Sequence, residues 1–158
     1  YYRINQQNVH AYVMGEHGDS SFIPWSVANI SNVPLADCQK LIVNSEGVYP
    51  ELNYDDIETY VRKSGARVIE RKGATFYAIS VSVCHIIKCL LGGIDTTMTV
   101  STMMHGEYGI DDVCLSVLSV VGREGAHGKI LVPLTDDEIA KLRHSADCLK
   151  DIIRQVEI

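Results

Sequence analysis

The sequence predicts an α+β domain in which an antiparallel sheet packs against long helices. Three observations support this prediction. Strand-like segments follow one another between residues 96 and 132 with turn residues between them, and a long amphipathic helix comes after them. The chain also lacks the regular strand, helix, strand alternation and the G-x-G-x-x-G run of nucleotide-binding α/β domains.

The first predicted element is a strand over Val9–Met14 that leads into a glycine-bounded loop. Its sequence, V-H-A-Y-V-M, is rich in β-branched and aromatic residues, and G-E-H-G-D-S follows it directly. Loops held at strand ends often carry functional side chains.

Farther along, Asn44–Asn53 is polar and contains a glycine and a proline, which predicts an irregular connection.

Two helices are predicted in the middle of the chain. Tyr54–Ile69 consists largely of helix formers with apolar residues on one side, and Gly65 predicts a break or a close packing contact. Thr75–Leu91 has apolar residues on nearly every face and is followed by two glycines. We therefore expect the second helix to be long and mostly buried.

Three strands are predicted next, over Thr96–Met104, Val113–Val121 and Gly128–Val132. The first alternates threonine or serine with apolar residues, which is the spacing of a strand with one wet face. The turn residues of H-G-E-Y-G-I and G-R-E-G-A-H-G separate the three segments. Short connections of this kind indicate an antiparallel meander.

The last predicted element is an amphipathic helix laid over the sheet. Thr135 and Glu138 form a T-x-x-E capping box, in which each side chain satisfies the other residue's free backbone donor. Apolar residues then recur every three or four positions, at Ile139, Leu142, Ala146, Leu149, Ile153 and Val156.

Length and charge restrict the number of domains and the classes of partner that the chain can have. The chain has 158 residues, of which 46% are hydrophobic, so we expect residues 1–158 to form one domain with one core. The formal net charge is -6, from 14 basic and 20 acidic residues. No dense basic cluster that could follow a phosphate backbone is present, which argues against nucleic acid as a partner.

The cysteines and the apolar runs indicate a cytoplasmic protein that does not use a membrane as a partner. The longest apolar stretch, Phe76–Leu91, is interrupted by polar residues and falls short of the ~20 apolar residues of a membrane span. An odd number of scattered cysteines without a C-x-x-C pair predicts reduced thiols, packed as small hydrophobic residues. They are Cys38, Cys84, Cys89, Cys114 and Cys148.

His17 is the best catalytic candidate on residue type. It stands between Gly15 and Gly18 at a predicted strand end, and the neighbouring carboxylates of Glu16 and Asp19 favour the imidazolium form. Such a histidine can give and take a proton near neutral pH. The residue pattern alone leaves an ordinary surface histidine as the alternative.

Other chemistry has less support. A metal site made of His10, His17 and Asp19 is disfavoured, because the two histidines are an odd number of residues apart in a strand-like segment and point to opposite faces. We expect no metal. Ser20 and Ser21 lack the G-x-S-x-G setting of an activated serine nucleophile, which disfavours a hydrolase. His85 is predicted to be a hydrogen-bonded core residue, and turn or helix-surface positions are predicted for His105, His127 and His144.

Four runs of sequence resemble the L-lactate dehydrogenases of the lactate/malate dehydrogenase superfamily. N-V-H-A-Y-V-M-G-E-H-G-D-S-S-F-I-P-W-S (Asn8–Ser26) is similar to the family's active-site strand and loop, and K-G-A-T-F-Y-A-I-S (Lys72–Ser80) to its K-G-x-T-x-x-A-I. Y-G-I-D-D-V-C-L-S-V and L-T-D-D-E-I-A-K-L-R-H-S-A-D resemble its closing sheet and helix. Malate dehydrogenases more often carry G-G-H-G-D, so G-E-H-G-D favours the lactate branch.

The resemblance implies roles for four residues. His17 would be the general acid and base that protonates the keto oxygen of pyruvate as hydride arrives at the carbon. Thr75 would lie beside the substrate, with a helix N-cap as its purely structural alternative. Ile79 would pack on the nicotinamide ring, although it could equally be a core residue. His10 matches the histidine that helps to hold fructose 1,6-bisphosphate at a subunit interface in the bacterial enzymes that this effector activates.

The resemblance also implies a carboxy-terminal substrate domain without its Rossmann domain. The chain begins with Tyr1 and not with methionine, which suggests a fragment. In the family, three features lie upstream of this region. They are the NAD-binding domain, the aspartate that pairs with the histidine, and the arginines that bind the substrate carboxylate. We therefore expect the isolated chain to be inactive and to expose an apolar face through which it could associate. The complete enzyme would use NAD in the cytoplasm, in glycolysis or fermentation, as a homotetramer.

Two alternatives stay open. Within the enzyme class, the chain could be half of an L-2-hydroxyisocaproate or malate dehydrogenase, because the discriminating residues lie upstream in the family. Outside that class, it could be a non-catalytic oligomerisation module that keeps the family's shape.

Overall fold

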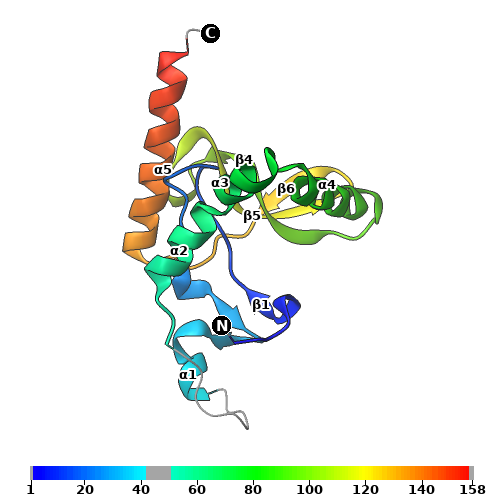
Figure 1. The fold of residues 1–158 in the computed structure, drawn as a ribbon. Coiled ribbons are helices and arrows are strands. Elements are labelled where there is room, and N and C mark those ends of the chain that lie inside the picture. The colour runs from blue at the N-terminus through cyan, green and yellow to red at the C-terminus, as the bar shows by residue number, and fades with distance from the viewer. Residues whose placement is uncertain (1, 42–50, 157–158) are drawn as a thin grey trace.

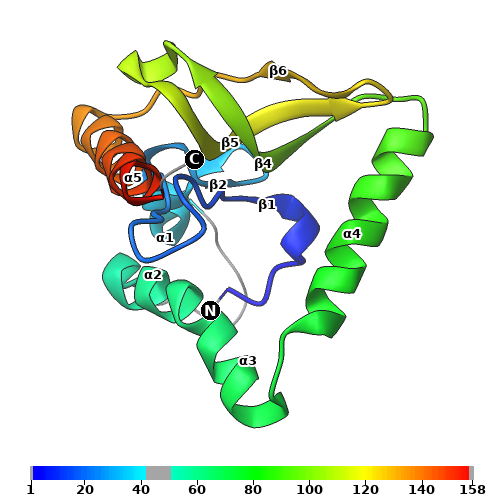
Figure 2. The same cartoon turned by 90° about the horizontal axis from the view of Figure 1, so that it is seen from above.

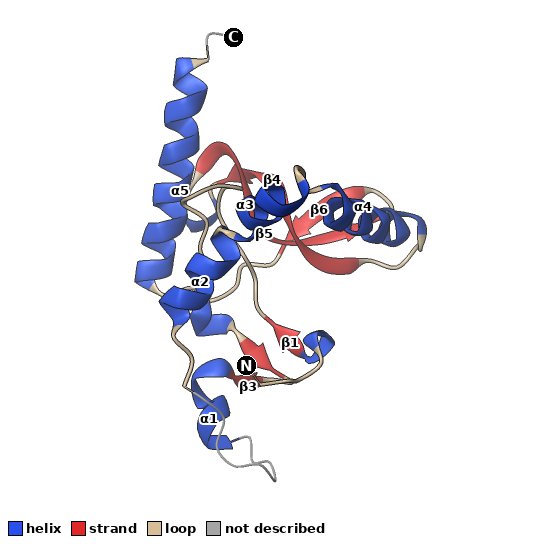
Figure 3. Ribbon diagram, viewed as in Figure 1, coloured by secondary structure: helices blue, strands red, loops and turns tan. Residues whose placement is uncertain are grey.

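A computed structural model describes residues 2–41 and 51–156, and its architecture is the predicted α+β arrangement (Figures 1 and 3). The larger of two antiparallel sheets contains β4 (Thr96–His105), β5 (Asp111–Gly122) and β6 (Gly125–Lys129), in that order. Figure 1 shows the long helix α5 (Asp136–Gln155) on one side of this sheet.

The predicted meander is confirmed, but its third strand begins three residues early. Strand β4 pairs with β5 from Thr96 opposite Val121 down to His105 opposite Asp111. Only two residues separate β5 from β6, so Gly125 already pairs with Gly122. The turn is therefore tighter than the glycine-rich sequence suggests. His127 consequently lies in strand β6 and not in the predicted turn. In the strand, its Nε2 is 3.1 Å from Asp95 Oδ2.

The core lies between the sheet and α5. The capping box of Thr135 and Glu138 is present as predicted, and buried Leu142 and Ala146 of α5 pack in one cluster with residues of β4 and β5. The main members of that cluster are Met14, Phe22, Met104, Val113, Leu115 and Val117. The prediction that the whole helix lies over the sheet is wrong at its end. The carboxy-terminal end of α5 projects beyond the sheet (Figure 1). Ile153 and Val156, near that end, are exposed.

The amino-terminal segment forms a smaller sheet with a second core. It contains β1 (Val9–His10), β2 (Asn29–Ile30) and β3 (Val33–Pro34), and three 3₁₀ helices η1 (Gln6–Asn8), η2 (Trp25–Val27) and η3 (Leu35–Asp37) accompany it. Helix α1 (Cys38–Leu41) follows η3. The strand predicted over Val9–Met14 is regular for two residues only, because beyond His10 the chain leaves the small sheet. It pairs again at isolated bridges, Met14 with Phe22 and Gly15 with Ser116.

Among the described residues, three longer helices follow α1 before the larger sheet, namely α2 (Tyr54–Arg62), α3 (Ser64–Lys72) and α4 (Phe76–Leu91). The predicted break in the first helical segment is at Lys63 and not at Gly65. Figure 2 shows α4 running along one side of the molecule, far from α5. Of the predicted connection Asn44–Asn53, residues 44–50 lie outside the described residues.

The prediction that α4 is mostly buried is wrong. None of its residues is buried, and Val81 and Leu91 are 71% and 82% exposed. An apolar pattern on nearly all faces predicts burial, but burial needs a partner surface, and the described residues cover this helix only in part, where it approaches β5. His85 is correspondingly an exposed residue and not a core one.

The cysteines also differ from the expectation of packed thiols. All five are free, but only Cys38 is buried, whereas Cys84 and Cys114 are exposed.

Within the described residues, no helix is long and apolar enough to cross a membrane.

Candidate functional site

The loop that carries His17 extends the larger sheet. Gly15 exchanges two backbone hydrogen bonds with Ser116 of β5, at 3.0 and 2.8 Å. Strand β6 pairs with β5 only over Ser119–Gly122, so Gly15 occupies the stretch of the same edge that β6 leaves open. Met14 and Phe22 close the base of the loop by pairing with each other. The backbone on both sides of residues 15–21 is thereby fixed to the core.

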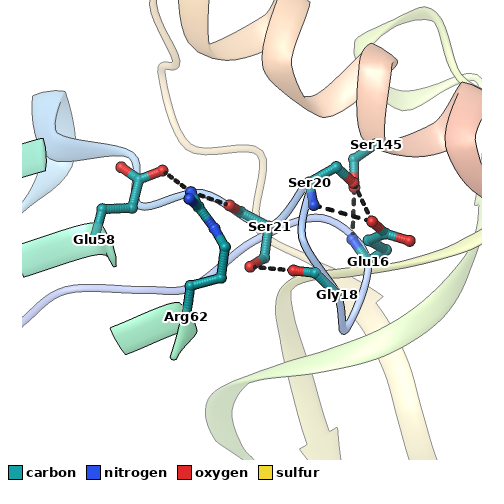
Figure 4. A network of polar contacts seen from close by, with 7 residues as sticks. All are labelled: Glu16, Gly18, Ser20, Ser21, Glu58, Arg62 and Ser145. Carbon is teal, nitrogen blue, oxygen red and sulfur yellow. Dashed lines mark hydrogen bonds and ion pairs between the residues drawn. The ribbon is translucent and has the colours of Figure 1, made fainter. Parts of the chain in front are cut away.

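A buried serine of α5 holds the amino-terminal end of this loop (Figure 4). Ser145 is fully buried, and its hydroxyl oxygen accepts a hydrogen bond of 2.7 Å from the backbone N–H of Glu16. The Ser20 hydroxyl lies 3.0 Å from the same oxygen. The carboxylate of Glu16 in turn accepts hydrogen bonds from Ser20 N–H and from Ser20 O–H, at 3.0 and 2.5 Å. These contacts form a closed ring around residues 16–20.

The carboxy-terminal end of the loop is held from α2. Arg62 donates a hydrogen bond of 3.0 Å to the carbonyl oxygen of Ser21, and its guanidinium forms an ion pair with Glu58 at 2.7 Å. Within the loop, the hydroxyl of Ser21 donates to the carbonyl of Gly18 at 2.8 Å. Figure 4 shows α2 and α5 reaching the loop from opposite sides.

His17 itself is exposed and lines a pocket. The pocket has a volume of about 410 Å³, and Gly15, Glu16 and His17 line it together with residues of β4, β5 and α5. Those residues include Ser101, Met103, Cys114, Ser116, Leu149 and Ile153. Among the described residues, none forms a hydrogen bond or ion pair with the imidazole of His17. The side chain is therefore free to meet a ligand, while its backbone is fixed.

The structure does not bring the other predicted site residues to this pocket. Thr75 occupies the N-cap position of α4, but its side chain makes no capping hydrogen bond. Ile79, on the first turns of α4, is 58% exposed. His10 lies exposed in β1, opposite Asn29 of β2. None of the three lines the pocket beside His17. The described residues contain no group of three or more potential metal ligands.

The segment after the loop is anchored by Glu138 at the start of α5. Its carboxylate accepts hydrogen bonds from the N–H and O–H of Ser26, at 3.0 and 2.5 Å, and from the N–H of Thr135 at 2.9 Å. Burial opposes ionisation of this carboxyl, but these donated hydrogen bonds outweigh it and hold the pKa of Glu138 below its ordinary value.

Sequence reasoning did not find Ser145. A signal existed, because Ser145 falls three residues after Leu142, on the apolar stripe of the predicted terminal helix. A serine on such a stripe must find a hydrogen-bond partner when it is buried. The pattern could not identify the partner, since Glu16 is 129 residues away in the chain.

Known proteins resemble the whole chain. A family model described as lactate/malate dehydrogenase, alpha/beta C-terminal domain, matches residues 2–158. An L-lactate dehydrogenase of Thermoanaerobacterium saccharolyticum is 38% identical over 156 residues, which are 98% of this chain and 49% of the relative. The chain thus spans about half the length of the curated relatives it matches.

Solved structures agree in fold. An L-lactate dehydrogenase of Clostridium thermocellum superimposes with a TM-score of 0.84 at 35% identity, over 98% of this chain and 49% of that one. A malate dehydrogenase of Archaeoglobus fulgidus, solved in complex with NADH, gives a TM-score of 0.77 at 31% identity, over 94% of this chain and 44% of that one.

Proposed function

This chain belongs to the family of lactate/malate dehydrogenase α/β carboxy-terminal domains, and from that membership we propose that residues 1–158 form the substrate-side domain of an NAD-dependent L-lactate dehydrogenase. The presentation of His17 is the observation that carries the proposal. A glycine-bounded loop, fixed at both ends, presents an exposed histidine that lines a pocket. That arrangement suits a group that must exchange a proton with a small ligand.

In the proposed reaction, protonated His17 donates a hydrogen bond from its ring N–H to the keto oxygen of pyruvate. NADH, when bound, supplies the hydride to the carbonyl carbon. As negative charge develops on the oxygen, the proton passes from His17 to that atom and completes the hydroxyl group of L-lactate. In the reverse direction, neutral His17 accepts the proton. A general acid of this kind contributes about 10² to 10⁴-fold in rate.

We assign Thr75 a hydrogen bond to the substrate and Ile79 an apolar contact with the nicotinamide ring. The Thr75 hydroxyl is not used to cap α4, so it remains available to a ligand. More than half of Ile79 is exposed, which suits contact with a flat apolar ring. The sequence contains no glycine-rich phosphate-binding run, so we assign the phosphates of the dinucleotide to a separate domain.

The proposal extends to assembly. We infer that the complete enzyme is a cytoplasmic homotetramer and that the apolar side chains exposed along α4 are covered there by another domain or subunit. We assign His10 to a fructose 1,6-bisphosphate site at a subunit interface. Without the arginines that hold a substrate carboxylate in the family, the isolated chain should bind a 2-oxo acid poorly.

Steady-state rates on three 2-oxo acids test the proposal. The chain is fused to the amino-terminal half of the Thermoanaerobacterium saccharolyticum relative, and NADH oxidation is followed with pyruvate, oxaloacetate and 2-oxoisocaproate. We expect the highest kcat/KM with pyruvate. The intact relative serves as the positive control, and the change in NADH fluorescence on titration with protein reports whether the fused protein binds cofactor.

Each other outcome identifies an alternative. A preference for 2-oxoisocaproate or oxaloacetate would indicate a hydroxyisocaproate or malate dehydrogenase domain. A fused protein that binds NADH but oxidises it with none of the three acids would support the non-catalytic module instead.

A further inference from the structure

We propose that Ser145 is a positioning residue for His17, acting through the backbone of Glu16. The proposal rests on the proposed function in one respect, the role of His17 as the proton donor. Ser145 itself touches no substrate in this scheme. Its hydroxyl determines where the loop, and hence the imidazole, is held.

The first argument is that the position of His17 depends on its backbone. Within the described residues the imidazole is exposed and forms no hydrogen bond, so what this chain contributes to its position acts through the backbone. The adjacent peptide N–H, that of Glu16, donates to Ser145 Oγ at 2.7 Å. A hydrogen bond one residue before the histidine, to an atom in the core, therefore limits how far the catalytic ring can move.

The second argument is that Ser145 holds both sides of the histidine. Its hydroxyl lies 3.0 Å from that of Ser20, three residues after His17. The Glu16 carboxylate closes the ring by accepting from Ser20 N–H and O–H. A single buried oxygen on α5 thus contacts the loop before and after the histidine, as Figure 4 shows.

The third argument concerns the alternative that Ser145 is an ordinary buried serine. Ser119 of β5 is such a residue. It is equally buried, and its hydroxyl donates at 3.2 Å to the carbonyl of Val117, two residues away on the same strand. Ser145, in contrast, accepts a hydrogen bond from the backbone N–H of Glu16, 129 residues away. Ser119 is therefore the matched control for the loss of a buried hydroxyl that does not contact the loop.

The experiment compares Ser145→Ala, Ser145→Cys and Ser119→Ala. Amide hydrogen exchange is measured in the chain itself, and kcat and KM for pyruvate in the fused protein. For Ser145→Ala we expect exchange at Glu16 to be about tenfold faster, because that N–H loses its acceptor. We expect kcat to fall by about 10 to 10²-fold, with a smaller change in KM, since displacement of a catalytic group by about 1 Å can cost that much.

Ser145→Cys separates positioning from packing. Cysteine fills similar space, but its sulfur is a weak acceptor, so kcat should stay low if the hydrogen bond matters and should recover if only volume matters. Ser119→Ala should leave kcat and Glu16 exchange within about twofold of wild type.

Three results would overturn the proposal. The first is unchanged exchange at Glu16 in Ser145→Ala. The second is a kcat that falls no further in Ser145→Ala than in Ser119→Ala. The third is a kcat that recovers in Ser145→Cys, because packing alone would then explain the loss. If the wild-type fused protein binds NADH but is inactive with all three acids, the proposed function fails, but the exchange measurement on the chain still decides whether Ser145 holds the loop.

Discussion

Gly15 and Ser145 approach each other so closely that residue 15 has no room for a side chain. A Cβ atom on residue 15 would lie 2.6 Å from Ser145 Oγ and 3.2 Å from Ser145 Cβ, and real Cβ contacts essentially never fall below 3.0 Å. Gly15 also has a φ of +97°, which side chains disfavour. Two independent reasons therefore require glycine before the candidate catalytic loop.

Gly15→Ala should destabilise the protein more than Gly125→Ala. Gly125 has a similar φ of +90°, but a Cβ atom there would meet no other atom within 4 Å, so alanine adds backbone strain alone, about 1 to 2 kcal/mol. At Gly15, overpacking adds about 1 to 3 kcal/mol. Urea denaturation measures both. The double variant Gly15→Ala with Ser145→Ala should recover part of the difference. Equal costs at the two glycines would contradict the close approach.

Glu138→Ala should cost about 2 to 3 kcal/mol of unfolding free energy, because it leaves Ser26 and the N–H of Thr135 without their acceptor. Asp137, exposed in the same first turn of α5, is the matched control. Its replacement by alanine should cost less than about 1 kcal/mol, since it interacts mainly with the helix dipole. Chemical denaturation provides the comparison, and similar costs at both positions would show that the contact with Ser26 adds little.

Stability should fall as the pH drops from about 4.5 to 2. The Lys129 ammonium, 2.8 Å from Glu107, and the donated N–H of His105 lower the pKa of Glu107 from 4.5 to about 2. A carboxyl with a lowered folded-state pKa contributes stability that is present above its unfolded pKa and is lost as pH falls through the folded value. In thermal melts across this range, the melting temperature of Glu107→Gln should therefore depend less on pH than that of the wild type. Glu124 is an exposed residue of the hairpin turn, and the melting temperature of Glu124→Gln should depend on pH as in the wild type.

Fructose 1,6-bisphosphate should lower the pyruvate concentration that gives half-maximal rate in the fused protein. His10→Ala should weaken this response without changing the rate at saturating pyruvate, because β1 is separate from the pocket beside His17. Rate curves with and without the effector measure both effects. If wild type does not respond to the effector, His10 has no effector role.

The parts of the fold that the sequence predicted are those governed by local rules. The Thr135 and Glu138 capping box and the β4, β5, β6 meander depend on neighbouring residues and short turns, and both are present. The prediction that α4 is mostly buried was wrong, because an apolar pattern shows that a helix favours contact with another surface but does not identify that surface. The sequence also predicted the loop histidine. It did not predict the hydrogen bond from Glu16 N–H to Ser145, because that contact joins residues far apart in the chain.

The central claim, that His17 is the proton donor, is tested most directly by His17→Ala in the fused protein. His105→Ala, at another exposed histidine, is the control. We predict that kcat for pyruvate falls by about 10² to 10⁴-fold in His17→Ala, with NADH binding and the thermal midpoint unchanged, while His105→Ala stays near wild type. Pyruvate reduction by His17→Ala at close to the wild-type rate would contradict the account.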